Sequence, residues 1–422
     1  MVELMGLLND SEPAVILGVL ADGKPVTLLH CLETRSRLGR PGLDTSVFHA
    51  SAVLEGAHFS TPEEIMFIRL SVLFSNVEEW MYPAGPDVRV SRRGNKMVME
   101  CEEPEAIRAT VGQGMNISVV PHARYTIIDG QAATHTETWF AVEPSQAKPL
   151  EDYLGVVSDI RNLVSLATTE RVRVLAMEGE LGASGPGVRP AKSEKKGVRV
   201  FLPFMNGPGA PTPVRRRDLL FRLADVPKDI GGLLARWLES AERVRCVHDL
   251  YFAAHHQPEM YVEHSFFCFV EALEAYHRRA IRRVDFDKEE LEQRKQDILG
   301  VLPADCQYKD WLSERLNYGN EPSLRKRLKE ILERFSPLCG QWFRSKREKN
   351  RFLDEVVARR NHLVHPDERW ETQAARGEIL ETLALRLKWL VVACLLEQLG
   401  LSADDIAGLL SRNMKYQHEI SL

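Results

Sequence analysis

The segment from residue 358 to residue 366 concentrates side chains that could cleave a phosphodiester bond. It reads ARRNHLVHP and holds Arg360, Asn361 and His365. Histidine titrates near neutral pH, so it can take the proton of a ribose 2′-hydroxyl. Arginine keeps its charge and can stabilise a pentacoordinate phosphate, while an amide can orient the phosphate or the histidine. Because the 2′-oxygen of RNA would be the nucleophile, this chemistry needs no metal ion, serine or cysteine.

The spacing of these residues requires a helix that ends just before Pro366. Arg360 and His365 are five positions apart, which is about 140° around a regular helix, so they would not converge on one. Asn361 and His365 are four apart and would share a face. Because a residue before proline avoids the α region, we expect His365 at the helix end, with its ring free to turn toward Arg360. The alternative interpretation is that these cations only cap the last carbonyls and offset the helix dipole.

Helical periodicity after Asp229 predicts the elements that position this segment. The last helix should be apolar on most sides and therefore central. We predict an all-α helical bundle over residues 226–422. The expected helices are Ser265–Arg283, Ser323–Phe335, Lys349–Val364 and Arg376–Leu399.

The first 145 residues show the short apolar runs and turn residues of antiparallel strands. A helix is expected from Leu150 to Ala167. The fold class is therefore α+β multidomain, with a β-rich antiparallel N-terminal domain over residues 1–225. The strand runs include Ala14–Ala21, Pro25–Leu32, Ser46–Leu54, Asn116–Pro121, Ala123–Ile128, Thr134–Val142, Arg171–Met177 and Gly197–Phe204, and Asp22-Gly23 marks a turn.

Composition excludes several classes of protein. The 422 residues carry a net charge of −5, so any surface for nucleic acid must be local. None of the seven cysteines has CxxC spacing, and no P-loop, GxGxxG or HExxH motif occurs, so we expect no metal and no cofactor. The apolar run Leu387–Leu396 is too short to span a bilayer, and no signal peptide is recognisable. We expect a soluble, cytoplasmic protein that does not contact a membrane.

Longer strings carry a resemblance to a known family. The Arg-Asn-x-x-x-His pattern followed by proline resembles the motif of HEPN ribonucleases. FFCFVEALEAYHR (266–278) and LSERLNYGNEPSLRKR (312–327) are similar to the C-terminal domain of ApeA-type anti-phage HEPN proteins. VTLLHCLE (26–33), LEGAHF (54–59) and VEEW (77–80) resemble the N-terminal domain of that family.

The resemblance implies a metal-independent endoribonuclease of anti-phage, abortive-infection defence. Arg360 would contact the scissile phosphate, His365 would act as general base or acid, and Asn361 would fill the polar position after the arginine. His362 lies outside the motif and is treated as a solvent-facing or neighbouring residue. Glu274 would orient Arg360, or would only pair with Arg278 four residues away.

The resemblance also implies partners: RNA, with tRNA as a candidate, a second copy of the chain in a homodimer, and a phage-derived trigger. Residues 322–365 hold twelve Lys or Arg against five acids, which predicts a phosphate track unless these charges only solvate helix faces. Trp342, Phe343 and Trp370 would stack on bases or belong to the core. The RNA-binding candidates are Arg278, Arg279, Arg282, Arg359, Lys346 and Arg347.

Two other functions remain open at this stage. One is a catalytically silent HEPN module that binds RNA or nucleotides, which the joint presence of Arg360, Asn361 and His365 disfavours. The other is the toxin of a toxin–antitoxin pair, which toxicity of the chain expressed alone would support. The sequence leaves open the RNA that is cleaved, the trigger and the way activity is restrained. It also leaves open whether the N-terminal domain senses an invader or positions the RNA.

Overall fold

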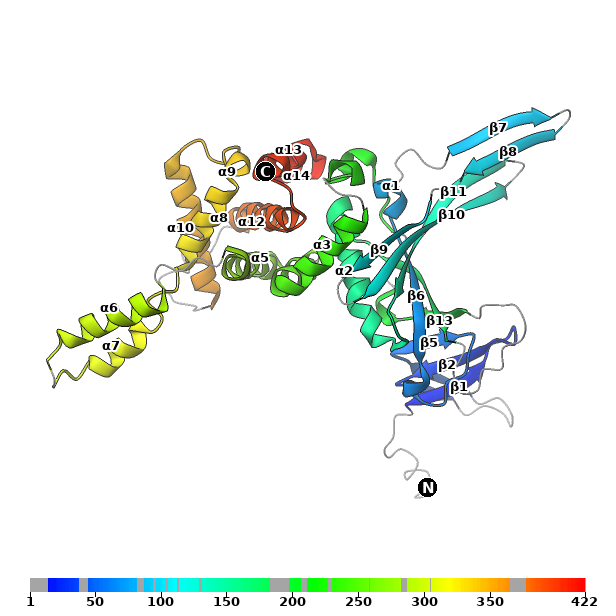
Figure 1. Ribbon diagram of the computed structural model, residues 1–422, viewed down its shortest axis with the longest axis horizontal. Coiled ribbons are helices and arrows are strands. Elements are labelled where there is room, and N and C mark those ends of the chain that lie inside the picture. The colour runs from blue at the N-terminus through cyan, green and yellow to red at the C-terminus, as the bar shows by residue number, and fades with distance from the viewer. Residues whose placement is uncertain are drawn as a thin grey trace, which may run out of the picture. The chain divides into compact units, whose positions relative to one another are not determined.

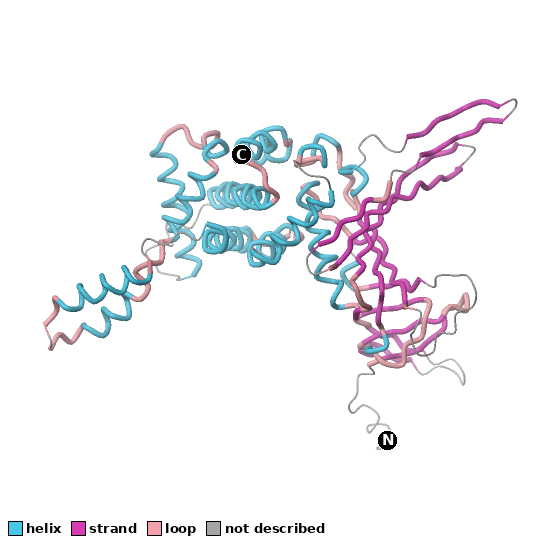
Figure 2. Tube along the Cα trace, in the orientation of Figure 1, coloured by secondary structure: helices cyan, strands magenta, loops and turns pink. Residues whose placement is uncertain are grey.

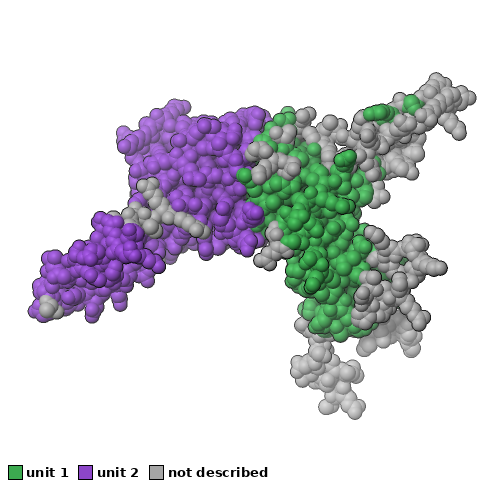
Figure 3. Space-filling view, viewed as in Figure 1, with its two compact units in different colours: residues 1–238 green, residues 239–422 purple. Residues whose placement is uncertain are grey.

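Strands fill the first part of the described chain and helices the second (Figure 2). The chain divides into two units, residues 1–238 and residues 239–422, coloured green and purple in Figure 3. The α+β fold class predicted above is thereby confirmed. This computed structural model describes residues 14–37, 45–81, 87–93, 96–102, 105–111, 114–128, 131–182, 197–205, 211–226, 230–257, 259–281, 287–303, 305–364 and 377–421.

The first unit is built on an antiparallel sheet, which Figure 1 draws in blue to green. Within the described residues its strands follow the order β1-β2-β5-β14-β13-β6-β11-β10-β9, with β12 also paired to β6. Strands β3 and β4 form a separate pair, as do β7 and β8. The strands are β1 (Val15–Val19), β2 (Pro25–Leu29), β3 (Leu32–Arg37), β4 (Thr45–His49), β5 (Ala52–Glu55), β6 (Met66–Phe74), β7 (Asp87–Arg93), β8 (Lys96–Glu102), β9 (Ile107–Val111), β10 (Met115–Ile128), β11 (Gln131–Glu143), β12 (Lys148–Pro149), β13 (Val174–Leu181) and β14 (Gly197–Phe201).

The turn predicted at Asp22-Gly23 joins β1 to β2. Gly23 has a φ of 85°, a conformation that glycine adopts without a steric penalty. The Leu20 amide donates to the Lys24 carbonyl at 2.8 Å and closes the turn. This short connection sets the register in which Val15 pairs with Leu29.

Two helices accompany the sheet, α1 (Val77–Met81) and α2 (Glu151–Thr168). The hydroxyl of Tyr153 on α2 donates to the Phe67 carbonyl of β6 at 2.7 Å, and both side chains are buried. The Phe67 ring also covers Gly179 on β13, where a Cβ would lie 2.3 Å from the ring. A residue larger than glycine at position 179 would therefore displace this core ring.

The second unit is helical in its described part, as Figure 1 shows in green through red. The helices are α3 (Ile230–Arg243, which begins in the first unit), α4 (Arg245–His255), α5 (Val262–Tyr276), the π-helical segment η6 (His277–Ile281), α6 (Lys288–Gly300), α7 (Lys309–Leu316), α8 (Leu324–Arg334), α9 (Ser336–Cys339), α10 (Lys346–Val364), α12 (Gly377–Gln398), α13 (Ala403–Arg412) and α14 (Met414–Ser421).

Helix α12 lies at the centre of this unit, as its sequence predicted. Its residues 389–396 are buried without interruption, and the helix packs along α5. The apolar stripe of α5 faces it with Phe266, Val270 and Leu273, all fully buried. Leu353 and Val356 of α10 are buried as well, so packing fixes the rotation of α10 about its axis. That rotation decides which way Arg360 points.

Candidate active site

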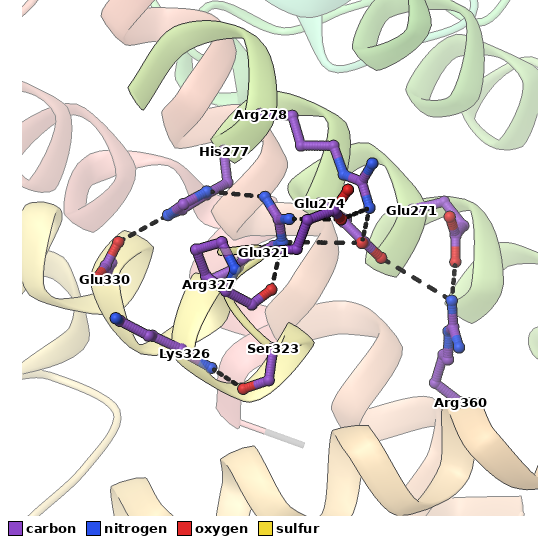
Figure 4. Close-up of polar contacts among 11 residues, drawn as sticks. Glu271, Glu274, His277, Arg278, Glu321, Ser323, Lys326, Arg327, Glu330 and Arg360 are labelled. Carbon is purple, nitrogen blue, oxygen red and sulfur yellow. Dashed lines mark hydrogen bonds and ion pairs between the residues drawn. The ribbon is translucent and has the colours of Figure 1, made fainter. Parts of the chain in front are cut away.

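Arg360 lies in the last two turns of α10 and reaches across to α5 (Figure 4). Its Nη2 lies 3.3 Å from Oε1 of Glu271 and 3.9 Å from Oε2 of Glu274. Its Nε is shielded from solvent and has no hydrogen-bond partner among the described residues. The side chain is 26% exposed, so part of it stays accessible to a ligand.

Asn361 and His362 follow Arg360 in the last turn of α10. Asn361 is exposed, and His362 is half-buried, with its Nδ1 unpartnered in the described part of the chain. The helix is described as far as Val364, the end expected from Pro366. His365 and Pro366 lie outside the described residues, so the meeting of His365 with Arg360 stays a prediction.

Glu274 on α5 makes both of the contacts that were considered from the sequence, one with Arg278 and one with Arg360. Glu274 accepts from Nη2 of Arg278 at 2.9 Å, as spacing alone suggested, and it also lies beside Arg360. Glu271 is the nearer partner of Arg360, and the sequence reasoning missed it. The signal that could have found it is the spacing of three between Glu271 and Glu274, which puts both carboxylates on one helical face.

Behind Glu274 lies a buried polar cluster that the sequence did not single out (Figure 4). Arg327 is 4% exposed, and its Nε donates to the Pro322 carbonyl at 2.9 Å. Its Nη1 lies 3.3 Å from Nδ1 of His277, and Nε2 of His277 lies 2.7 Å from Glu330. Because arginine can only donate, Nδ1 of His277 accepts and the ring proton sits on Nε2. Burial lowers the pKa of Arg327, and the nearby Arg278 adds to this effect.

Comparison with protein-family models gives two matches on this chain. Residues 1–237, more than half of its length, match the model described as ApeA N-terminal domain 1. The chain belongs to the ApeA family. Residues 268–405 match the model described as Apea-like HEPN, and this range contains Arg360. Comparisons with curated proteins and with solved structures found no match.

Membership in the ApeA family indicates a HEPN-type anti-phage nuclease. The HEPN match begins within α5 and includes both Glu271 and Glu274. It therefore contains Arg360 and both of its carboxylate partners.

The basic residues proposed for RNA binding are distributed unevenly over this ApeA-family HEPN region. Lys346 and Arg347 are exposed in the first turn of α10, where cations oppose the helix dipole. Arg359 is half-buried beside Arg360. Arg278 is engaged by Glu274 and, at 3.1 Å, by Glu321, whereas Arg279 is exposed. Arg282 lies outside the described residues.

The aromatic residues near the motif belong mainly to the core. Trp342 is buried, and its Nε1 donates to the Tyr416 hydroxyl at 2.8 Å. Phe343 packs on Phe352 with ring centroids 5.3 Å apart. These contacts favour the core interpretation over base stacking for both residues. Trp370 lies outside the described residues.

In the part of the chain that the structure describes, no helix is both long and apolar enough to cross a lipid bilayer. Across the same residues, His, Cys, Asp and Glu side chains form no group of three or more that could hold a metal ion.

Proposed function

We propose that this chain is a metal-independent endoribonuclease of anti-phage defence that cleaves RNA through Arg360 and His365. Arg360 would stabilise the phosphate, Asn361 would orient it, and His365 would move the proton. The reaction would occur in the cytoplasm and would arrest the host once infection is sensed. The N-terminal residues 1–225 would sense a phage-derived trigger or position the RNA.

The observation that carries this proposal is the position of the Arg360 guanidinium. It lies at the end of a packed helix, inside the HEPN match, and it is oriented by carboxylates on a second helix. A partly exposed ion pair contributes little to the stability of a fold. Stability alone is therefore a weak explanation for the pairing of Arg360 with these carboxylates. A fixed cation at a helix end that stays partly accessible is well placed to meet a phosphate.

The proposed step is an in-line displacement at phosphorus. His365 accepts the proton of the 2′-hydroxyl, and the 2′-oxygen forms a new bond to the phosphorus. The bond from phosphorus to the 5′-oxygen breaks, and that oxygen takes up a proton from the general acid. The products are a 2′,3′-cyclic phosphate and a 5′-hydroxyl. Arg360 offsets the charge that builds on the phosphate oxygens.

Unpaired RNA suits this step because a flexible sugar can rotate its 2′-oxygen into line with the leaving group. Loops of tRNA are therefore candidate substrates. A homodimer would place two copies of the motif around one cleft and would supply a second histidine as the general acid.

Replacing Arg360 or His365 by alanine tests the proposal. Each change should slow cleavage of purified RNA by about 100-fold or more, the loss seen when one charge-stabilising or proton-transferring group is removed. The measurement is the rate at which 2′,3′-cyclic phosphate ends appear, mapped by sequencing of RNA ends.

Arg351→Ala is the matched control, because Arg351 is an exposed arginine of the same helix that pairs with Glu355 at 2.9 Å. It should cleave at the wild-type rate. The proposal fails if the wild type and the Arg360→Ala protein, both folded and dimeric, leave the RNA equally intact.

A further inference from the structure

Arg360 is held by two carboxylates that stand one helical turn apart on α5. Glu271 and Glu274 both approach the same nitrogen, Nη2, at 3.3 Å and 3.9 Å. Within the described residues, Glu271 has Arg360 as its ion-pair partner and makes no second one. Two contacts on one nitrogen fix the plane of the guanidinium far better than one contact would, because they restrict rotation about the last bonds of the side chain.

Glu274 is itself held in place from behind. Arg278 binds its Oε1 at 2.9 Å, and Nε of the buried Arg327 lies 3.8 Å from the same oxygen. Arg327 is fixed in turn by the Pro322 carbonyl and by the His277 ring. The position of Glu274 is thus set by a network of side chains on α5, η6 and α8, as Figure 4 shows.

Within these contacts three arginines (278, 327 and 360) face three glutamates (271, 274 and 321), and Glu330, which pairs with His277 beside Arg327, adds a fourth carboxylate. The carboxylates therefore add no attraction for a phosphate, and Glu271 and Glu274 even oppose its approach. Their contribution must lie in orienting the guanidinium, and it should appear in the chemical step rather than in RNA binding.

We infer that Glu271 and Glu274 are positioning residues that fix the Arg360 guanidinium for the chemical step. The inference rests on the proposed ribonuclease function. Neither carboxylate touches the RNA. Each acts through Arg360, and Glu271, which has the closer contact, carries the larger share.

Steady-state kinetics of RNA cleavage by the Glu271→Gln, Glu274→Gln and double variants test this role. Glutamine keeps the shape of glutamate and removes its charge, so the fold should survive. We expect kcat to fall by about 10-fold for Glu271→Gln and by about 100-fold for the double variant, with KM unchanged or lowered. A lowered KM follows because a negative charge near the phosphate is gone. Glu263→Gln, an exposed position in the first turn of the same helix, is the charge-matched control and should retain wild-type kcat.

A second readout needs no activity. The side-chain Nε–H signal of Arg360, followed by NMR on arginine-labelled protein and assigned with Arg360→Lys, should broaden or shift in the double variant as the guanidinium loosens. If the wild type cleaves no RNA while this signal still responds, the proposed function fails and the positioning contact stands. The inference is overturned if kcat of the folded double variant stays within twofold of wild type. It is also overturned if kcat rises, because the carboxylates would then be restraining Arg360 rather than positioning it.

Discussion

The guanidinium of Arg327 shows what a buried charge requires in this fold. It is 4% exposed, and a cation removed from water is costly unless its donors find partners. The Pro322 carbonyl, the His277 ring and the carboxylates of Glu274 and Glu321 supply them. The same contacts that compensate the charge also join η6, α8 and the residues just before α8.

Removing Arg327 should therefore destabilise the helical unit. We expect Arg327→Ala to lower the free energy of unfolding by about 3 kcal/mol, because a buried imidazole and two carboxylates each lose one of their partners and the buried space is left unfilled. Urea denaturation followed by far-UV circular dichroism measures the effect. Arg325→Ala is the control from the same helix, since Arg325 is 40% exposed and pairs with Asp354, and it should cost less than about 1 kcal/mol. Equal midpoints for the two variants would contradict this account.

The candidate site was only partly readable from the sequence. Arg360 and Asn361 could be named because their types and spacing carry chemistry within one short segment. Glu271 was missed, since its contact with Arg360 spans 89 positions and depends on how α5 packs against α10, and only its spacing from Glu274 hints at it. His277 stood in a quoted string, but its burial between Arg327 and Glu330 follows from tertiary packing that no local pattern encodes.

Among the elements, the bounds of α10 were predicted closely. The helix is described as far as Val364, the end that was expected, and the next residue, His365, lies outside the described residues. Its start, expected near Lys349, is at Lys346. Ser345 directly precedes this start, and its hydroxyl accepts from the Glu348 amide at 3.2 Å, a capping signal that the sequence reasoning overlooked.

Strand β10 shows a second limit. The sequence suggested two strands, Asn116–Pro121 and Ala123–Ile128, but β10 is continuous from Met115 to Ile128, with Pro121 opposite Thr138. The amide of Thr138 donates to Glu78 at 2.7 Å, so it points away from β10, and the pair at Pro121 needs no hydrogen bond between the strands. The pairing of β10 with β9 ends at Val119. Pro121 therefore has no partner strand on that side, and its lack of an N–H group costs no hydrogen bond between strands.

Helix α10 also suggests where RNA extends beyond the site. Lys346 and Arg347 stand 14 and 13 residues before Arg360, which is about 20 Å along a helix. Replacing both by alanine should weaken RNA binding and reduce the slope of log Kd against log salt by about 1.4, since each contact with single-stranded RNA contributes about 0.7. Cleavage at saturating RNA should not change.

Fluorescence anisotropy with labelled RNA over a salt series checks this prediction. The control is the double change Lys288→Ala and Arg294→Ala, which removes the same charge from the exposed surface of α6. An unchanged slope for the α10 variant, or an equal change in the control, would show that Lys346 and Arg347 do not contact the RNA.

At the scale of the whole molecule, the net charge of −5 gives RNA no general attraction, so binding must rely on local basic residues. The family matches cover residues 1–237 and residues 268–405, and the nuclease chemistry is proposed for the second range alone. One arginine and one histidine are few groups for in-line displacement. We therefore expect two copies of the chain to act together.

A dimer that joins one wild-type chain to one His365→Ala chain tests this cooperation. If both copies of the motif serve one cleft, the mixed dimer should lose most of its activity, because either the general base or the general acid is missing. Cleavage by mixed dimers isolated through two different affinity tags is the measurement. Mixed dimers that keep half of the wild-type activity would mean that each site lies wholly within one chain.

The π-helical segment η6 has a consequence for how this region can change over evolution. A π turn contains one residue more than an α turn of similar length, which lets His277 lie buried directly after the buried Tyr276. Deleting a single residue from this stretch would remove the extra residue and would rotate everything that follows it by about 100° around the helix axis. We therefore expect this stretch to accept exchanges of its exposed side chains while its length stays fixed.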